Sequence, residues 1–437
     1  MRNLSLILIA VCAIFASSVT SPAQEIAKAA PAATPASAAN LDPAAATQAW
    51  LDTVPADQRA KSDGYFEGGY WLILWNFLLA AAISIFLLQS RISARLRDFA
   101  ERNTRFKALQ VVLYAIPYIL FVALLSFPLV IYQDFYREHQ YDLATQTFGP
   151  WLADQLKGLA LAFFFGPLAL IILYAVFRRA KRTWWIWGTI VAVGLSMFGN
   201  FIFPVFVAPI FNTYKPIENP AIRDPILALA QANEIPVKQV FEFDASRQTT
   251  RVSANVAGFL GTTRIALNDN LLKECTVSEI REVMGHEMGH YVLNHGAKLT
   301  TYQGISFFVA FGLTSVLFGA AVRRWGDRWG VRDIGDVAGL PLLALILATY
   351  SFVTTPFYNS VIRITEREAD AFGINTAREA EASATVALKL GKYRKLNPGP
   401  LEEFVFFDHP SGRARIRMAM DWKAAHLPAG SVDSRSP

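Results

Sequence analysis

Cysteine is nearly missing from this 437-residue sequence, which contains only Cys12 and Cys275. Cys12 lies in the apolar core of an N-terminal segment, residues 1–23, that has the pattern of a secretory signal peptide: Arg2 precedes the core and small residues follow it. Removal of this segment would leave a single thiol, which excludes an internal disulfide. An uncleaved anchor is the alternative interpretation, because Pro22 falls in the expected cleavage site.

Charge is also scarce. Only 17% of residues are charged, whereas 53% are hydrophobic and the mean hydropathy is +0.29, a composition that favours a membrane protein. No repeat of 20 to 50 residues is apparent. Six apolar runs are each near the length that crosses a bilayer: Tyr70–Leu88, Leu109–Tyr132, Leu159–Phe177, Trp184–Phe211, Gly304–Val322 and Val337–Tyr358.

Basic residues gather in three alternate connections between these runs, around residues 91–107, 178–182 and 323–332. The positive-inside rule therefore predicts that all three connections are cytoplasmic. This distribution accounts for the net charge of +6 without a nucleic-acid partner. We expect a multi-pass protein of the plasma (inner) membrane whose other connections, and whose C-terminus, lie on the periplasmic or extracytoplasmic side.

The segment from Thr276 to His295 carries the most specific chemical pattern. His286, Glu287 and His290 form His-Glu-x-x-His, and a helix places both histidines on one face. With only six histidines in the chain, this coincidence favours a metal site over structural histidines. Zinc would need a third protein ligand and a position for water, and Glu287 would be the general base. Thr276 and Glu279 have the spacing of a capping box.

A third ligand is available just beyond the last apolar run. Glu366 and Asp370 are four residues apart and share a helical face. Glu366 can complete the metal site, while Asp370 can accept an N–H from a ligating histidine. Taken alone, the segment also fits an ordinary solvated helix, because Arg367 and Glu368 are typical of a surface.

Between the fourth and fifth apolar runs the sequence predicts a small domain of mixed structure. Pro225–Asn233 is expected to be helical and Gln239–Phe243 to be a strand. Val252–Asn255 and Arg264–Leu267 are expected to pair as strands around a turn at 258–261.

These motifs resemble the type I CAAX prenyl endopeptidases, which are multi-pass gluzincin proteases that trim prenylated C-termini, and their bacterial relatives. The resemblance runs from about Phe66 to Trp422. Besides the metal motifs it includes Asp244-Ala-Ser-Arg247, Ser253-Ala-Asn255 ahead of Arg264-Ile, Tyr136-Arg-Glu-His-Gln-Tyr141, and Asp408-His-Pro410 with Arg415.

The resemblance implies one zinc ion per chain, held by His286, His290 and Glu366, with Glu287 as the base. Departures from the family pattern at Ile362, Arg367 and Glu368 leave the choice of substrate open.

The resemblance also implies a substrate site. Ser253, Ala254 and Asn255 are expected on an edge strand that aligns the substrate backbone, and His409 and Arg415 are expected to steady the substrate or the oxyanion.

The predicted fold is mainly α: a polytopic membrane helix bundle of about six spans after a signal sequence, with an inserted small α+β zincin-like catalytic domain. The predicted parts are a signal peptide (1–23), an Ala/Pro-rich linker (24–65), four membrane helices (66–211), a catalytic domain (212–302), two membrane helices (303–360), the third-ligand and C-terminal catalytic segment (361–422) and a flexible tail (423–437).

We predict an integral-membrane zinc endopeptidase that hydrolyses membrane-associated or exported proteins. Prenylated CAAX proteins are cytosolic, so an outward-facing site disfavours them as substrates. A zinc-stabilised scaffold or chaperone without turnover is the alternative, although nothing but water activation requires Glu287. A transporter is a weaker alternative, because few charges lie inside the apolar runs.

Overall fold

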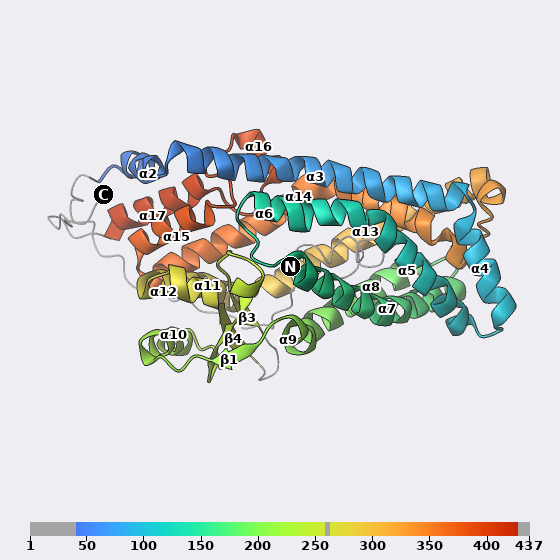
Figure 1. Cartoon of the computed structure of the whole chain (residues 1–437), viewed down its shortest axis with the longest axis horizontal. Coiled ribbons are helices and arrows are strands. Elements are labelled where there is room, and N and C mark those ends of the chain that lie inside the picture. The colour runs from blue at the N-terminus through green and yellow to red at the C-terminus, as the bar shows by residue number, and fades with distance from the viewer. Residues whose placement is uncertain (1–40, 258–262, 427–437) are drawn as a thin grey trace. The chain divides into compact units, whose positions relative to one another are not determined.

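A computed structural model describes residues 41–257 and 263–426 (Figure 1). The expected signal peptide, the turn at 258–261 and most of the predicted tail lie outside these residues. Within them, the chain divides into two compact units. The first comprises Tyr70–Phe203 and Lys298–Thr355; the second comprises 41–69, Pro204–Ala297 and 356–426.

Six helices in the described residues are long and apolar enough to cross a membrane, as predicted. They are α3 (Ala56–Gln89), α5 with η1 and α6 (Lys107–Gln140), α7 (Phe148–Arg179), α8 with η2 and α9 (Trp184–Phe211), α13 (His295–Trp329) and η4 with α14 (Val337–Ala377). The separate bounds within these spans are α5 (Lys107–Ile131), α6 (Arg137–Gln140), α8 (Trp184–Ile202), α9 (Ala208–Phe211) and α14 (Leu340–Ala377), and α4 (Ile92–Asn103) connects the first two. The mainly helical, polytopic architecture is confirmed.

Large apolar side chains remain exposed along these helices. Trp71, Leu124, Phe164 and Val316 each keep more than 60% of their surface exposed. Contiguous apolar surface of this kind is rarely left in contact with water, and acyl chains would cover it in a bilayer.

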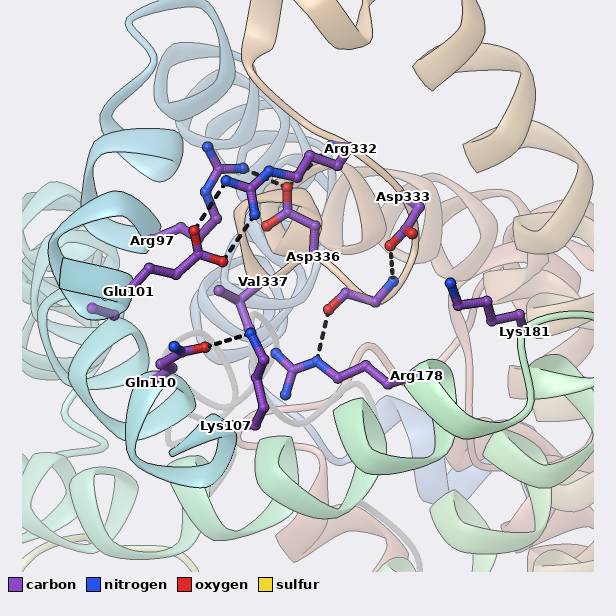
Figure 2. Close-up of a pocket in the computed structure, with 12 residues that line it drawn as sticks. Arg97, Glu101, Lys107, Gln110, Arg178, Lys181, Arg332, Asp333, Asp336 and Val337 are labelled. Atoms are coloured by element: carbon purple, nitrogen blue, oxygen red, sulfur yellow. Dashed lines mark hydrogen bonds and ion pairs between the residues drawn. The ribbon is translucent and has the colours of Figure 1, made fainter. Parts of the chain in front are cut away.

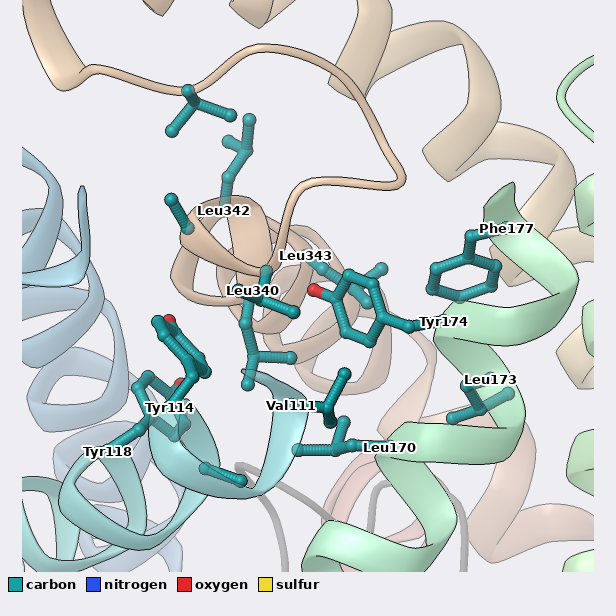
Figure 3. Packing of buried hydrophobic residues seen from close by; sticks show 14 of the residues in the cluster. Val111, Tyr114, Tyr118, Leu170, Leu173, Tyr174, Phe177, Leu340, Leu342 and Leu343 are labelled. Carbon is teal, nitrogen blue, oxygen red and sulfur yellow. The ribbon is translucent and has the colours of Figure 1, made fainter. Parts of the chain in front are cut away.

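The first unit has its own apolar core. Figure 3 shows side chains from α5, α7 and the start of α14 packed together, including Tyr114, Tyr118, Tyr174 and Phe177, all of which are fully buried. Ser93 of α4 donates a hydrogen bond of 2.7 Å to the Ala338 carbonyl oxygen. That bond fixes α4 against the 3₁₀ turn η4 (Val337–Gly339) that precedes α14.

The second unit contains a four-stranded sheet in the order β1-β2-β4-β3. Its strands are β1 (Tyr214–Pro216), β2 (Val240–Phe243), β3 (Ala254–Ala257) and β4 (Arg264–Asn268). β2 and β4 are parallel, whereas the other two pairs are antiparallel. The predicted pairing of the last two strands is confirmed, with β3 beginning two residues later than expected. β1 was not predicted.

Helices α10 (Pro220–Ala232), α11 (Asp269–Glu274) and α12 (Val277–Val292) lie beside this sheet (Figure 1). Ile226, Ile265, Leu267, Met284 and Met288 join α10, α12 and the sheet in one buried cluster. The other helices of this unit are α2 (Pro43–Asp52), α15 (Ala380–Leu390), α16 (Pro400–Phe406) and α17 (Gly412–His426), with a short 3₁₀ turn η3 (Ala245–Arg247).

Part of the segment for which we predicted a flexible linker, 24–65, is helical. Asp42 caps α2 by accepting a hydrogen bond from the Ala44 N–H, and Pro43 occupies the first helical position. Leu51 is buried in a cluster with residues of α15 and α17. The alanine-rich composition that suggested a linker is equally favourable to a helix once a cap and an apolar contact are present.

Candidate metal centre and active site

Helix α12 carries the metal motif and begins as the sequence predicts. The Thr276 side chain accepts from the Glu279 N–H, and the Glu279 carboxylate accepts from the Thr276 N–H, so the capping box is complete. Lys389 of α15 lies 2.7 Å from the same carboxylate. The start of α12 is therefore fixed on both sides, which sets the position of His286 and His290 along the helix.

Two glycines let α14 come close to α12. A Cβ atom on Gly285 would lie 3.1 Å from the Gly373 Cα, and one on Gly289 would lie 3.2 Å from the Ala369 Cα. Such contacts are tighter than most Cβ atoms make, so a side chain at either position would require α14 to shift by a few tenths of an ångström. The backbones are therefore nearly in contact, and this brings Glu366 and Asp370 of α14 beside the two histidines.

Three ligand atoms converge at this crossing. His286 Nε2 and His290 Nε2 are 3.1 Å apart, and the Glu366 carboxylate oxygens lie 3.3 Å and 3.5 Å from them. Two imidazole nitrogens and one carboxylate oxygen can thus meet within 4.8 Å of one another. This donor set and spacing fit one zinc ion with a position left for water.

Charge around the histidines also fits a cation. Glu366 and Asp370 lie beside Arg415, whose Nε lies 3.0 Å from Asp370 Oδ2 and whose Nη2 lies 3.5 Å from Glu366 Oε2. Burial opposes a charge on His286, but Asp370 and Glu366 outweigh it and raise the pKa of this imidazole to about 10. The carboxylates therefore attract one further positive charge, which a metal ion would supply in place of the proton.

Asp370 orients the first histidine. Its Oδ1 lies 2.8 Å from His286 Nδ1, so that nitrogen carries the hydrogen and Nε2 presents its lone pair to the site. The prediction that Asp370 receives an N–H from a ligand histidine agrees with this geometry.

His290 is oriented by a chain of two hydrogen bonds, through His295 to Glu368, that was not predicted from the sequence. His290 Nδ1 lies 2.9 Å from Nδ1 of the fully buried His295, whose Nε2 lies 2.9 Å from Glu368 Oε2. Since Glu368 can only accept when ionised, His295 donates to it and accepts from His290. The His290 Nε2 lone pair is then directed at the site. Asn294, with φ of 56°, makes the turn that brings His295 back to the motif.

Comparison with known proteins supports the same interpretation of the site as its geometry does. Residues 216–423 match the family described as Peptidase family M48, and residues 43–213 match the one described as CAAX prenyl protease N-terminal, five membrane helices. The chain is 31% identical over 340 residues to the uncharacterized metalloprotease YhfN of Bacillus subtilis, covering 76% of this chain and 78% of that protein.

The chain belongs to peptidase family M48. It is also 29% identical to a CAAX prenyl protease 1 homolog of Arabidopsis thaliana, covering 66% of this chain and 68% of that protein. The crystal structure of S. mikatae Ste24p has the same fold, with a TM-score of 0.70 at 20% identity over 86% of this chain and 95% of that one. Membership makes this chain a multi-pass membrane zinc metalloprotease, and His286, His290 and Glu366 fit the metal site of such an enzyme.

Two further predicted residues of this M48 peptidase also lie at the metal site. Burial raises the pKa of Glu287 to about 7, which suits a group that must accept and return a proton near neutrality. His409, in the loop between α16 and α17, places Nε2 3.2 Å from Glu366 Oε2, and its Nδ1 lies 2.8 Å from Asp408 Oδ1. Arg415, in contrast, is engaged by the two carboxylates described above.

The predicted substrate strand forms one edge of the described sheet. The Asn268 N–H donates to the Ser253 carbonyl at 2.9 Å, so Ser253 and Asn268 are a hydrogen-bonded pair. Hydrogen-bonded and non-hydrogen-bonded pairs alternate along β3 and β4 from that point. Asn255 therefore directs its main-chain groups toward β4, whereas those of Ala254 and Val256 point to the open edge. The side chains of Ala254 and Val256 pack on the cluster that contains α12, so the Asn255 side chain lies on the other face.

Proposed function

We propose that this chain is an endopeptidase that cleaves membrane-associated or exported proteins, using one zinc ion held by His286, His290 and Glu366. The observation that carries the proposal is the convergence of these three ligands at a crossing where Glu287 and His409 also lie. In this proposal the segments 212–302 and 361–422 supply the catalytic groups.

Zinc, when bound there, would polarise the scissile carbonyl and make an attacking water more acidic. Glu287 accepts the proton of that water and then returns it to the leaving amine nitrogen. His409 steadies the bound substrate; because the Asp408 carboxylate accepts from its Nδ1–H, its Nε2 can donate to the developing oxyanion only as an imidazolium. Arg415 was expected to steady the substrate or the oxyanion; its contacts with Asp370 and Glu366 support a further role in positioning those carboxylates.

The substrate adds to the sheet as a further strand. The outward N–H and C=O groups of Ala254 and Val256 bond its backbone, while the Asn255 side chain contacts it from one face. Ser253 contributes least, since its N–H donates to Asn268 Oδ1 at 3.1 Å and its carbonyl accepts from the Asn268 N–H. Recognition through the main chain tolerates many side chains and suits a protease with varied substrates.

The test of the chemistry is Glu287→Gln in the purified, detergent-solubilised full chain. We expect zinc content, measured by mass spectrometry of the metal, to stay at that of the unchanged protein. Cleavage of an unfolded reporter protein should fall by about 10²- to 10⁴-fold. Glu218→Gln, the same change at an exposed site, is the matched control. Undiminished cleavage by the Glu287 variant would contradict the mechanism, and zinc without any cleavage in the unchanged protein would favour the scaffold alternative.

Orientation decides which proteins can be substrates. We propose that the catalytic segments face the extracytoplasmic side, on the basis of the three basic connections. The test uses a Cys12→Ser, Cys275→Ser background with a new cysteine at the exposed Ala425 and, in a second protein, at the exposed Asn103. A membrane-impermeant maleimide should label Ala425→Cys in intact cells and Asn103→Cys only after lysis. The reverse pattern would restore cytosolic, CAAX-type substrates.

A further inference from the structure

A cavity of about 290 Å³ lies in the first unit and is lined by no residue of the catalytic segments 212–302 and 361–422. Its lining comes from α4, the first turn of α5, the end of α7 with the turn that follows, and the connection between α13 and α14 (Figure 2). These are the same three connections whose basic residues determine the predicted orientation. Its volume is just below the usual range for drug-sized ligands, which begins at about 300 Å³, and suits a smaller group.

Cations outnumber anions in the lining. Arg97, Lys107, Arg178, Lys181 and Arg332 face three carboxylates, those of Glu101, Asp333 and Asp336.

Two of the five cations are neutralised. Arg97 lies 2.5 Å from Asp336, and Arg332 forms a bidentate pair with Glu101 at 2.9 Å and 3.0 Å. Asp333 accepts from the Gly335 N–H at 2.8 Å.

The other three cations have no carboxylate within ion-pair distance in the part of the chain that the structure describes. They are Lys107, Arg178 and Lys181. Figure 2 shows Lys107 and Arg178 extending from α5 and α7 toward the same space. The Lys107 ammonium donates one hydrogen bond, to Gln110 Oε1 at 3.1 Å, and has two further N–H groups.

The cavity is built on a fixed frame. Arg178 Nε donates to the Gly335 carbonyl at 3.0 Å, and its guanidinium lies 5.6 Å from the centre of the Tyr174 ring. The buried Asp336 holds Arg97 and also accepts from the Ala338 N–H at 3.1 Å. Because these groups are already ordered, an anion that binds here loses little free energy to rearrangement of the protein.

We propose that this cavity binds a phosphate group, with Lys107, Arg178 and Lys181 as its unneutralised cations. A planar guanidinium and two ammonium groups offer several donors. They suit a phosphate, which has several acceptor oxygens, better than they suit a small anion with one acceptor atom. Two sources share this chemistry: the head group of an anionic phospholipid and a soluble phosphate. Basic pockets at the ends of membrane helices commonly hold lipid head groups.

The test measures binding to the full chain in detergent after delipidation. One titration uses phosphatidylglycerol, a second uses phosphatidylcholine as the uncharged comparison, and a third uses inorganic phosphate. The variant is Lys107→Gln with Lys181→Gln, both exposed side chains. Its control is Arg95→Gln with Arg182→Gln, which removes the same charge from exposed positions of the same connections without touching the lining.

We expect the unchanged protein to bind phosphatidylglycerol in preference to phosphatidylcholine. The lysine variant should bind it roughly 30-fold more weakly, since each cation near an anionic lipid contributes about a factor of five, and the control should bind normally. Tight binding of inorganic phosphate, lost in the same variant, would identify the soluble source instead. Equal binding by the lysine variant and the control would overturn the proposal, provided that thermal unfolding shows both proteins to be folded.

Discussion

The metal centre of the second unit and the basic cavity of the first unit are both built around a buried arginine–aspartate pair, but their remaining charges are opposite. At the metal centre, the two carboxylates of Glu366 and Asp370 share their ion pairs with Arg415. In the cavity, five cations exceed three carboxylates. The paired charges give each region a fixed geometry, and the unpaired excess indicates the sign of the ligand. At the metal centre Glu366 is buried, where an excess charge without a partner is costly, whereas Lys107 and Lys181 in the cavity are exposed and attract an anion by their combined charge. Each region therefore favours a ligand of the opposite sign.

The largest effect should come from removing the excess carboxylate at the metal centre. Glu366→Gln takes away one ligand and one negative charge, so zinc content should fall to background. Cleavage should drop roughly a thousandfold or more, because the metal contributes several kcal/mol to transition-state stabilisation. Metal analysis and reporter cleavage measure the two losses, with Glu218→Gln as the control. Full zinc content in this variant would shift the third ligand to another group, and His409 Nε2, 3.2 Å from Glu366, is the nearest candidate.

The two ligand histidines provide a finer comparison, since a carboxylate supports His286 directly and His290 only through His295. His295→Ala removes the acceptor of the His290 N–H, so zinc should leave for a chelator about 10- to 100-fold faster. His295→Gln is the conservative variant, because its amide can accept from His290 and donate to Glu368. Rescue by glutamine separates this positioning role from simple loss of packing. Equal damage by alanine and glutamine would contradict it.

The close approach of α12 and α14 should be sensitive to one methyl group. A Cβ atom on Gly373 would lie 2.8 Å from the His286 main-chain nitrogen, so Gly373→Ala must push the helices apart. Overpacking of this kind costs about 1 to 3 kcal/mol, and zinc affinity should fall with it. Thermal unfolding with and without chelator measures both effects. Gly69→Ala is the matched control, since nothing lies within 4 Å of its added Cβ. A Gly373 variant that unfolds like the control would show that the crossing can relax.

Features that depend on local periodicity could be predicted from the sequence. The six spans, the capping box at Thr276 and the shared face of Glu366 and Asp370 all follow from helical spacing, and the structure reproduces them. Each of these features is decided within one element.

Features that depend on how elements meet could not be predicted. Glu368 looks like a surface residue, and its side chain is indeed 43% exposed, but its oxygen lies beside the buried His295. That contact requires the left-handed turn at Asn294 and the approach of α14. Asparagine and glycine permit the two, but neither residue specifies that His295 and Glu368 will meet. The short strand β1 lies within the predicted catalytic domain, 212–302, but no strand was predicted at its position. The N–H and C=O groups of Ala254 point to the open edge because of the register between β3 and β4, and that register cannot be read from the sequence.

The smallest expected effect tests the charge excess of the cavity in the opposite direction. Glu101→Gln removes the bidentate partner of Arg332 and leaves its longer contact with Asp98, at 4.0 Å; the exposed pair with Glu101 contributes little stability by itself. One more unneutralised cation should tighten binding of the phosphate ligand by up to about fivefold. Asp327→Asn, an exposed change outside the lining, is the control in the same titration. Unchanged affinity in the Glu101 variant would mean that the ligand contacts only Lys107, Arg178 and Lys181. Arg97 and Arg332 would then only hold the structure around the cavity.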